Sequence, residues 1–212
     1  KIPKFKNSNS KKEGVKRYTK ATRSILAIIE EHGFITCNIA SRIQYKGQKQ
    51  AYINAARKLR TMEQNKLLVH YIYPQTKEYI YQIKAKQISD HKKILIDFYS
   101  RLNELVDEVI YFNSKEISWP IAKRRNDGHI IYKLNNNIYG ILIEVDFSHY
   151  TSQEKLMDIY NSKEVHMWYK ENYGTDNYFP SILIISLLGD TKYSKVPFSY
   201  NTLDFEFSNI KD

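Results

Sequence analysis

Two apolar strands joined by three consecutive asparagines constrain the fold of this chain more than any other feature. Residues 129–134 and 138–147 are rich in β-branched and aromatic residues, and residues 135–137 between them are asparagines, which tolerate the positive φ values of a tight turn. On the second strand Glu144 and Asp146 alternate with aliphatic residues. The pattern therefore predicts a β-hairpin with both carboxylates on one face.

The register of this hairpin decides whether a third carboxylate joins the pair. If the last two asparagines form a two-residue turn, Asp127 pairs with Asp146, and His129 pairs with Glu144. Paired residues point to the same face of a sheet, so Asp127, Glu144 and Asp146 would form one cluster. A shift of one residue would move Asp127 to the other face, so this expectation depends on the turn.

Three carboxylates held together repel one another unless a cation neutralises them. Mg²⁺ and Mn²⁺ prefer such oxygen ligands, and a bound metal of this kind can activate water and stabilise a phosphoryl transition state. The alternative is that these acids are exposed residues on an open sheet face. Asp127 and Gly128 could also form no more than a turn.

The residues after the hairpin complete a sheet domain. Residues 151–154 read Thr-Ser-Gln-Glu, a capping box that predicts a helix from residue 152 to about residue 170. Residues 181–188 are apolar without alternation, as in a buried strand, and residues 196–207 contain a last strand. We therefore expect an α/β domain over residues 109–212.

Composition excludes several classes of protein. Hydrophobic residues make up 42%, enough for a packed core, yet no apolar run approaches the ~20 residues that cross a bilayer. The lysine-rich start does not resemble a signal peptide, and Cys37 is the single cysteine, so we expect a cytoplasmic protein without disulfides or a Cys-rich zinc site. The sequence contains no Gly-rich phosphate-binding loop, so we do not expect a nucleotide-driven motor.

Charge is distributed unevenly along the chain. Residues 1–90 hold 19 Lys and Arg against 6 Asp and Glu, a net charge of +13, whereas residues 91–212 hold 14 against 17, a net charge of −3. This asymmetry predicts two modules, the first of which meets a polyanion. Residues 1–20 are polar and basic, and we expect either a flexible arm that follows DNA or a plain solvated tail.

Residues 21–86 have the pattern of three helices followed by a hairpin. The expected elements are a helix from Thr22 to a stop at Gly33, a short helix capped by Thr36, a helix over residues 49–63, and strands over residues 67–73 and 78–83. Residues 87–108 form a linker helix with an apolar side that packs on either module or dimerises.

The stretch from GFITCNIASRI to KLRTMEQNKLL resembles the winged helix-turn-helix superfamily. In that layout the helix after the turn enters the major groove, where Gln and Asn read adenine, Arg reads guanine and Lys contacts phosphate. The inner residues of this helix should be Ile53, Ala56 and Leu59. The polar face could instead be merely solvated, or the module could bind protein. The expected DNA-binding residues of the helix and the wing are Lys49, Gln50, Tyr52, Asn54, Arg57, Lys58 and Lys77.

The second module also resembles a known fold. An Asp before a hairpin, Glu-x-Asp or Glu-x-Lys on its second strand and a following helix are similar to the restriction-endonuclease-like PD-(D/E)xK fold. More narrowly, RRNDG and ILIEVDFSHYTSQEKLMDIY resemble the replication-relaxation family of plasmid and integrative-element proteins, which is similar to one class of mobilisation relaxases. The family's Arg-x-Asp, Glu-x-Asp and Lys-Leu-x-x-Tyr are matched by residues 125–127, 144–146 and 155–160, and the resemblance covers about residues 21–200.

This resemblance implies roles for individual residues. Asp127, Glu144 and Asp146 would hold Mg²⁺ or Mn²⁺ and act in catalysis together with Lys155, which would aid the nucleophile. Nucleases of this fold usually carry Lys two residues after the Glu, where this chain has Asp146. Lys155 would then be a migrated lysine. The alternative is a domain that has lost catalysis and kept a binding surface. Asn126 replaces the usual Pro before the Asp.

These patterns lead to two hypotheses, and whether the chain is an enzyme stays open between them. Both concern a fold of mixed α+β or α/β type with a winged helix and a nuclease-like domain. In the first hypothesis the protein binds and nicks a replication or transfer origin of a mobile genetic element. The second is a non-catalytic DNA-binding regulator or relaxosome accessory factor. The expected partner is double-stranded DNA, with a homodimer or relaxosome and replication proteins as further partners and no membrane.

Two minor alternatives complete this set. One is a protein-binding scaffold. The other is a covalent tyrosine, Tyr150 or Tyr160, although packing explains these residues as well.

Overall fold

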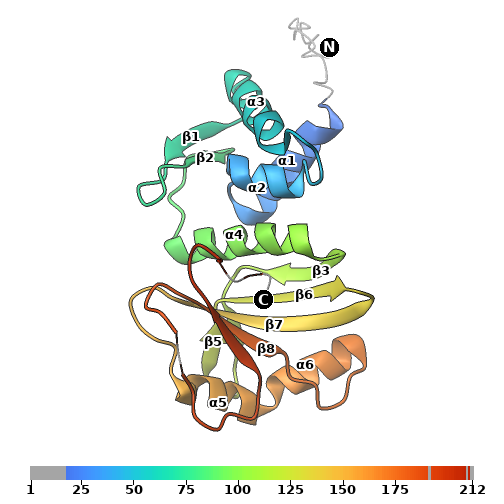
Figure 1. The fold of residues 1–212 in the computed structure, drawn as a ribbon, viewed down its shortest axis with the longest axis vertical. Coiled ribbons are helices and arrows are strands. Elements are labelled where there is room, and N and C mark those ends of the chain that lie inside the picture. Colours follow the sequence, from blue (N-terminus) through green and yellow to red (C-terminus); the bar gives the residue numbers. More distant parts are fainter. Residues whose placement is uncertain (1–17, 191, 209, 211–212) are drawn as a thin grey trace, which may run out of the picture.

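The computed structural model describes residues 18–190, 192–208 and 210, and these residues form a mixed α+β fold. The expected α+β character is thus confirmed. The described part of the chain contains six helices, one five-stranded mixed sheet and two two-stranded sheets (Figure 1). None of its helices is long and apolar enough to cross a membrane. The basic arm expected over residues 1–20 lies almost wholly outside the described residues.

The first module is built from three helices and a hairpin, as expected. Thr19 caps the first helix, which ends at Gly33, where φ is 85°. The Thr36 hydroxyl accepts a hydrogen bond from the N–H of Ile39 and starts the second helix. The elements are α1 (Lys20–His32), α2 (Cys37–Ile43), α3 (Ala51–Gln64), β1 (Val69–Ile72) and β2 (Tyr79–Gln82).

The inner face of α3 differs from the sequence-based prediction. Leu59 is buried as expected, but its buried partners are Ala55 and Met62. Ile53 is 51% exposed, so its predicted place in the core is wrong, and Ala56 is only half-buried. An i, i+4, i+7 stripe that starts at Ala55 sets the phase of the helix, and Ile53 lies off this stripe.

Helix α4 (Asp90–Leu105) lies between the two modules and packs on both (Figure 1). Ile96 belongs to the core of the first module, whereas Leu95, Phe98 and Leu102 belong to a second core against the five-stranded sheet. The predicted linker helix therefore packs on both modules and not on one alone. It serves as a layer that both modules share.

The sheet has the order β3-β6-β7-β8-β9. Strands β3, β6 and β7 are antiparallel neighbours, whereas β7, β8 and β9 run parallel. The strands are β3 (Glu108–Asn113), β6 (Gly128–Leu134), β7 (Asn137–Asp146), β8 (Ser181–Ser186) and β9 (Tyr200–Leu203). A separate antiparallel pair, β4 (Ile117–Trp119) and β5 (Arg124–Asn126), precedes β6 and was not predicted.

Two helices cover the face of the sheet opposite α4. They are α5 (Gln153–Ser162) and α6 (Glu164–Tyr173). The single helix predicted up to about residue 170 is wrong, because Lys163 adopts a φ of 63°, a left-handed conformation that stops α5. The Ser162 hydroxyl accepts a hydrogen bond from the Glu164 N–H at 3.3 Å where α6 begins.

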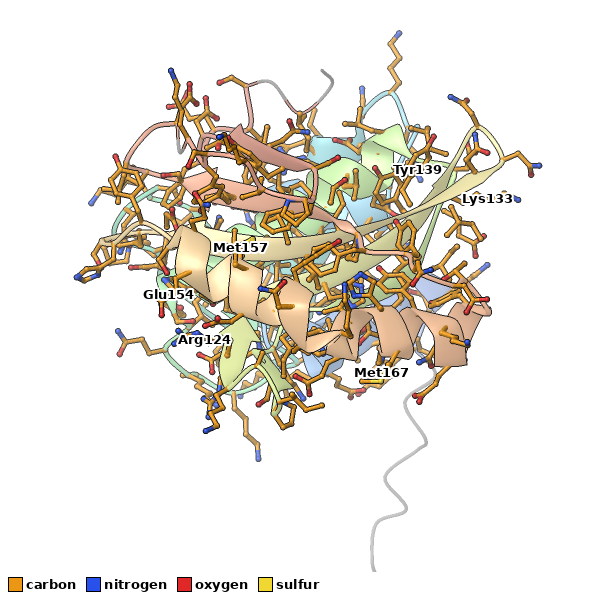
Figure 2. All side chains as sticks on the ribbon, turned by 90° about the horizontal axis from the view of Figure 1, so that it is seen from below. Arg124, Lys133, Tyr139, Glu154, Met157 and Met167 are labelled. Carbon is orange, nitrogen blue, oxygen red and sulfur yellow. The ribbon has the colours of Figure 1, made fainter. Side chains whose placement is uncertain are left out.

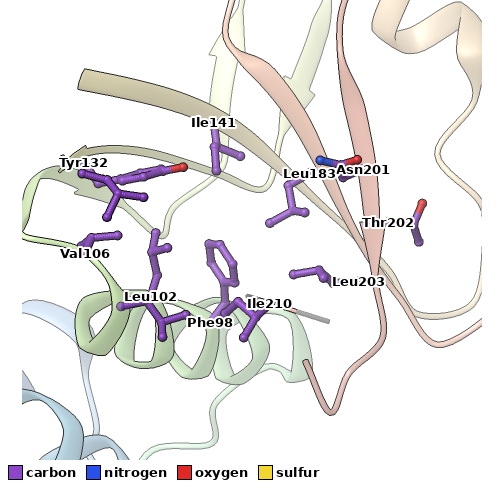
Figure 3. A pocket seen from close by; sticks show the side chains of 12 residues that line it. Phe98, Leu102, Val106, Tyr132, Ile141, Leu183, Asn201, Thr202, Leu203 and Ile210 are labelled. Carbon is purple, nitrogen blue, oxygen red and sulfur yellow. The ribbon is translucent and has the colours of Figure 1, made fainter. Parts of the chain in front are cut away.

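An apolar cavity of about 660 Å³ lies between α4 and the sheet (Figure 3). Phe98 and Leu102 of α4 face Tyr132, Ile141 and Leu183 of the sheet across it. Among the described residues that line it, none is an acid, Lys, Arg, His or Cys. This cavity lies on the face of the sheet opposite the carboxylates.

One close contact tests the packing of α6 on the sheet. A Cβ at Gly140 would lie 2.0 Å from the Tyr169 hydroxyl. We predict that Gly140→Ala lowers the free energy of unfolding by about 1–3 kcal/mol, because overpacking forces the backbone or the ring to move. Urea denaturation measures this cost. In a Tyr169→Ala background the same change should be nearly neutral, and an equal cost in both backgrounds would contradict the contact.

Candidate functional site

The hairpin turn lies one residue earlier than predicted. Asn135 and Asn136 have φ values of 51° and 65°, and Leu134 pairs with Asn137. His129 therefore lies opposite Leu142, so the predicted pairing of His129 with Glu144 and of Asp127 with Asp146 is wrong. The register moves by two residues, and because side chains alternate with a period of two, the residues keep their faces.

Glu144 and Asp146 lie on the same face at the carboxyl end of β7, beside the parallel strand β8. Leu142 on the same face belongs to the core under α5 and α6, whereas Ile143 and Val145 point to the α4 side. Glu144 and Asp146 are each only 1% exposed. Ligands of open sheets that contain parallel strands commonly bind at the carboxyl ends of those strands. The expectation of exposed acids on an open face is wrong for this pair.

The start of α5 supplies partners to both carboxylates. The backbone N–H and the hydroxyl of Thr151 donate to Asp146 Oδ1, at 2.9 and 2.7 Å. The Lys155 ammonium donates to Glu144 Oε2 at 2.7 Å. Ser152 is the N-cap of α5, because its hydroxyl accepts a hydrogen bond from the Lys155 N–H and so begins the helix beside the end of β7. The predicted capping box of Thr151 and Glu154 is wrong, since the Thr151 N–H donates to Asp146 and Glu154 pairs with Arg124.

One oxygen of each buried carboxylate has no partner. Glu144 Oε1 and Asp146 Oδ2 are inaccessible to solvent and form no hydrogen bond with any described residue. Leaving a buried acceptor unsatisfied costs about 1–3 kcal/mol, more when the group is charged. These two oxygens are hard donors on one face of one strand, and such donors suit a divalent cation.

Asp127 is held beside this pair by the backbone of β7. Its N–H donates to the Ile143 carbonyl at 3.1 Å, and its Oδ2 accepts from the Val145 N–H at 2.8 Å. The second oxygen, Oδ1, lies 3.8 Å from His91 Nδ1 of α4. Sequence reasoning missed His91, because it lies 36 positions before Asp127 and only the packing of α4 brings it near.

Asn126 shapes the bend that carries Asp127. It is 1% exposed and accepts a hydrogen bond from the Trp119 indole N–H at 2.6 Å. Its side-chain amide donates to the Gly128 carbonyl at 2.5 Å. Two buried hydrogen bonds therefore fix the Asn126 side chain at this bend.

The short β4–β5 sheet is tied to α5. Arg124 of β5 forms ion pairs with Asp158 at 2.7 Å and with Glu154 at 3.2 Å. Figure 2 shows Arg124 beside Glu154 at one end of the sheet, with Lys133 and Tyr139 of the hairpin at the other.

Burial governs the protonation of Glu144. Loss of solvation raises the pKa of Glu144 to about 8, the Lys155 ammonium opposes this rise, and the charges of Asp127 and Asp146 add to it. The buried carboxyl is therefore poised to bind or release a proton near neutral pH.

The predicted set of site residues is brought together only in part. Glu144 contacts Lys155, Asp146 lies on the same face two residues further along β7, and Asp127 is bound to the β7 backbone nearby. Yet within the described residues no three Asp, Glu, His or Cys side chains converge closely enough to form a preformed metal cluster.

The predicted DNA-binding residues lie on and near α3 and in the turn of the hairpin. Among the described residues, Lys49, Gln50, Tyr52, Arg57 and Lys77 are exposed. Asn54 and Lys58 are partly covered, since Asn54 donates to Gln48 Oε1 at 3.0 Å and Lys58 donates to the Thr19 hydroxyl at 3.1 Å.

Neither tyrosine considered as a nucleophile is aimed at the carboxylates. The Tyr150 hydroxyl donates to the Leu188 carbonyl at 2.7 Å. The Tyr160 ring packs against His166 and Phe179. Cys37 is a partly buried residue packed against the first core.

Comparisons with protein-family models, with curated proteins and with solved structures found no match to the chain.

The raised pKa of Glu144 predicts a pH-dependent stability. Because the carboxyl binds its proton more tightly in the folded state (pKa about 8) than in the unfolded state (4.5), its contribution to stability is complete below pH 4.5 and is lost as the pH rises through 8. The loss is at most about 1.4 kcal/mol for each pH unit between these values.

Glu144→Gln should remove this loss, so the variant gains stability relative to the native chain between pH 5 and pH 8. Urea denaturation in a chelating buffer measures the difference. The exposed Glu154→Gln is the control and should show no such trend. Parallel pH profiles of the native chain and Glu144→Gln would contradict the buried, proton-binding Glu144.

Proposed function

We propose that this chain is a sequence-specific DNA-binding protein that acts at a replication or transfer origin of a mobile genetic element, with a nuclease-like second module that nicks DNA using a divalent metal. The proposal is carried by one observation. Glu144 and Asp146 are buried side by side, each with one unpartnered oxygen, and Lys155 contacts Glu144.

The order of elements supports the resemblance to the PD-(D/E)xK fold. Asp127 lies directly before the β6–β7 hairpin, Glu144 and Asp146 lie on its second strand, and α5 follows. The resemblance places Lys two residues after Glu, where this chain has Asp146. Here Lys155 reaches Glu144 from the first turn of α5, as a migrated lysine should.

The residues of the site suit distinct roles. The free oxygens of Glu144 and Asp146 would hold Mg²⁺ or Mn²⁺, with Asp127 as the third carboxylate. A bound metal would lower the pKa of an attacking water and stabilise charge on the phosphate. The Lys155 ammonium donates a hydrogen bond to Oε2 of Glu144. The same ammonium would orient the attacking water. Thr151 fixes the rotamer of Asp146 through two hydrogen bonds.

The metal site predicts a pattern of losses in calorimetric titrations with Mn²⁺ and Mg²⁺. Binding should be lost in Glu144→Ala and Asp146→Asn, because each removes one of the free oxygens, and weakened in Asp127→Ala. Lys155→Gln should keep metal binding but lose nicking of origin DNA. Unchanged nicking in a Glu144→Ala protein that no longer binds metal would exclude this mechanism.

The first module supports recognition of duplex DNA. Residues 1–90 carry a net charge of +13, and α3 presents Gln50, Tyr52 and Arg57 to solvent. A steep fall of affinity with salt is expected, because each phosphate contact releases counterions.

Arg57 offers a test of base reading. Arg57→Ala should weaken binding to the cognate duplex by about 1–3 kcal/mol, because a bidentate contact to guanine is lost. Fluorescence anisotropy measures this change, with Lys170→Gln on α6 as a control. Equal affinities of Arg57→Ala and the native chain would remove α3 from the interface.

A second candidate function is a DNA-binding regulator or relaxosome accessory factor without catalysis. Two observations favour it: Asp146 stands where nucleases of this fold have Lys, and the described acids do not converge as a preformed cluster. This candidate predicts DNA binding of the same affinity in the native chain and Glu144→Ala, and no nicking by either.

A further inference from the structure

Three lysines from separate segments gather where the two modules meet. Lys86 lies in the connection from β2 to α4, Lys92 in the first turn of α4, and Lys115 in the loop after β3. Lys86 and Lys115 are exposed, and Lys92 is half-buried. Burial lowers the pKa of Lys92, and the positive charges of Lys86 and Lys115 lower it further. Contacts bring the three segments together: the Lys86 N–H donates to Gln82 Oε1 at 3.0 Å, and the Gln82 side chain donates at 3.2 Å to the carbonyl of Gly33, beside which Lys92 Nζ lies. The Lys115 N–H donates to Asn113, whose carbonyl lies with Leu95 of α4 at Gly128. We call Lys86, Lys92 and Lys115 the seam lysines.

The seam lysines lack a direct ion-pair partner in the described part of the chain. Lys93, the next residue along α4, is instead paired with Glu78 at 2.8 Å. Glu31 lies 3.9 Å from the His32 imidazole, and it raises the pKa of His32 whereas Lys92 lowers it. Like charges held together without a partner cost free energy, which a bound anion would recover.

The seam lysines border both modules. A Cβ at Gly33 would lie 3.5 Å from Lys92 Nζ, so the ammonium lies over the end of α1 in the first module. The residue before Lys92 is His91, whose imidazole lies 3.8 Å from Asp127 of the candidate site. The Lys115 N–H donates to Asn113 Oδ1 at 2.9 Å, and Asn113 pairs with His129, two residues after Asp127.

We infer that the seam lysines form a phosphate-binding surface that holds the DNA backbone between the duplex bound at α3 and the carboxylates at the end of β7. This inference rests on the proposed function and adds a surface that α3 and the carboxylates do not provide. Three ammonium groups on separate elements suit a polymer with a phosphate charge every ~1.7 Å of helix axis better than one compact anion. The sequence of the first module is also basic, which favours the same kind of polyanionic partner.

The test measures the salt dependence of DNA affinity for the full chain, with a fluorescein-labelled duplex of mixed sequence as the probe. Each phosphate contact contributes roughly 0.9 to the slope of log affinity against log salt. The triple variant K86Q/K92Q/K115Q should therefore lose about 2 to 3 from the magnitude of this slope. The matched control K133Q/K163Q/K170Q removes three lysines from the far end of the sheet and from the start and body of α6, and it should keep the native slope.

Single variants keep the test valid if the half-buried Lys92 is needed for folding. K86Q and K115Q change exposed residues, and each should lower the slope by about 1. Native slopes in both single variants and in the triple variant would overturn the seam surface and leave the proposed function standing. An equal loss in the control would also overturn it, because the effect would then be net charge alone. Salt-independent or absent binding by the native chain would overturn both proposals.

Discussion

Helix α4 is buried on two sides at once, and the position of the two modules relative to each other depends on this helix. Ile96 packs into the core of the first module, and Phe98 and Leu102 pack into the core above the sheet. Each fully buried aliphatic or aromatic side chain of this kind stabilises the fold by about 1.5–3 kcal/mol. Helix α4 thus contributes side chains to both cores and joins the two modules.

A buried ion network reinforces this junction. Lys93 of α4 is 2% exposed and pairs with Glu78, at the start of the second hairpin strand, and with Asp97 one turn further along α4. Glu78 also accepts a hydrogen bond from Asn38 of α2 at 2.6 Å. Breaking a buried pair leaves an uncompensated charge, so the network sets the orientation of the helices and hairpin on α4. The same first turn of α4 brings His91 to Asp127, which links that orientation to the candidate site.

Much of the fold could be predicted from local signals, and the exceptions have physical reasons. The cap at Thr36 acts through its own side chain, so the sequence was sufficient to predict it, whereas the cap of α5 is Ser152, one residue after the first residue of the predicted capping box. Three identical asparagines cannot define a turn by themselves. The stacked rings of Tyr132 and Tyr139, with centroids 5.5 Å apart, accompany the register that places the turn at the first two. Lys163 ends α5 without a Gly or Pro, a break that periodicity does not signal.

In the candidate site, too, local sequence predicts some features and packing between distant segments sets the others. Glu144 and Asp146 were predictable because strand alternation is local, and the place of Lys155 in a first turn because the Thr-Ser-Gln-Glu stretch signals the start of a helix. His91 and Asn126 were not, since their roles arise from packing between distant segments. The burial of both carboxylates, with one oxygen of each left unpartnered, also depends on the helices that cover the sheet. Sequence alone predicted the acids and left their burial undetermined.

The proposed nicking activity depends on metal binding by the unpartnered oxygens of Glu144 and Asp146. Crystals soaked in Mn²⁺ and measured by anomalous diffraction test this binding. We expect a manganese peak at ligand distance from Glu144 Oε1 and Asp146 Oδ2, and no such peak in Glu144→Gln crystals. Diffraction that shows both carboxylates without a peak between them, or manganese bound only elsewhere, would contradict this binding.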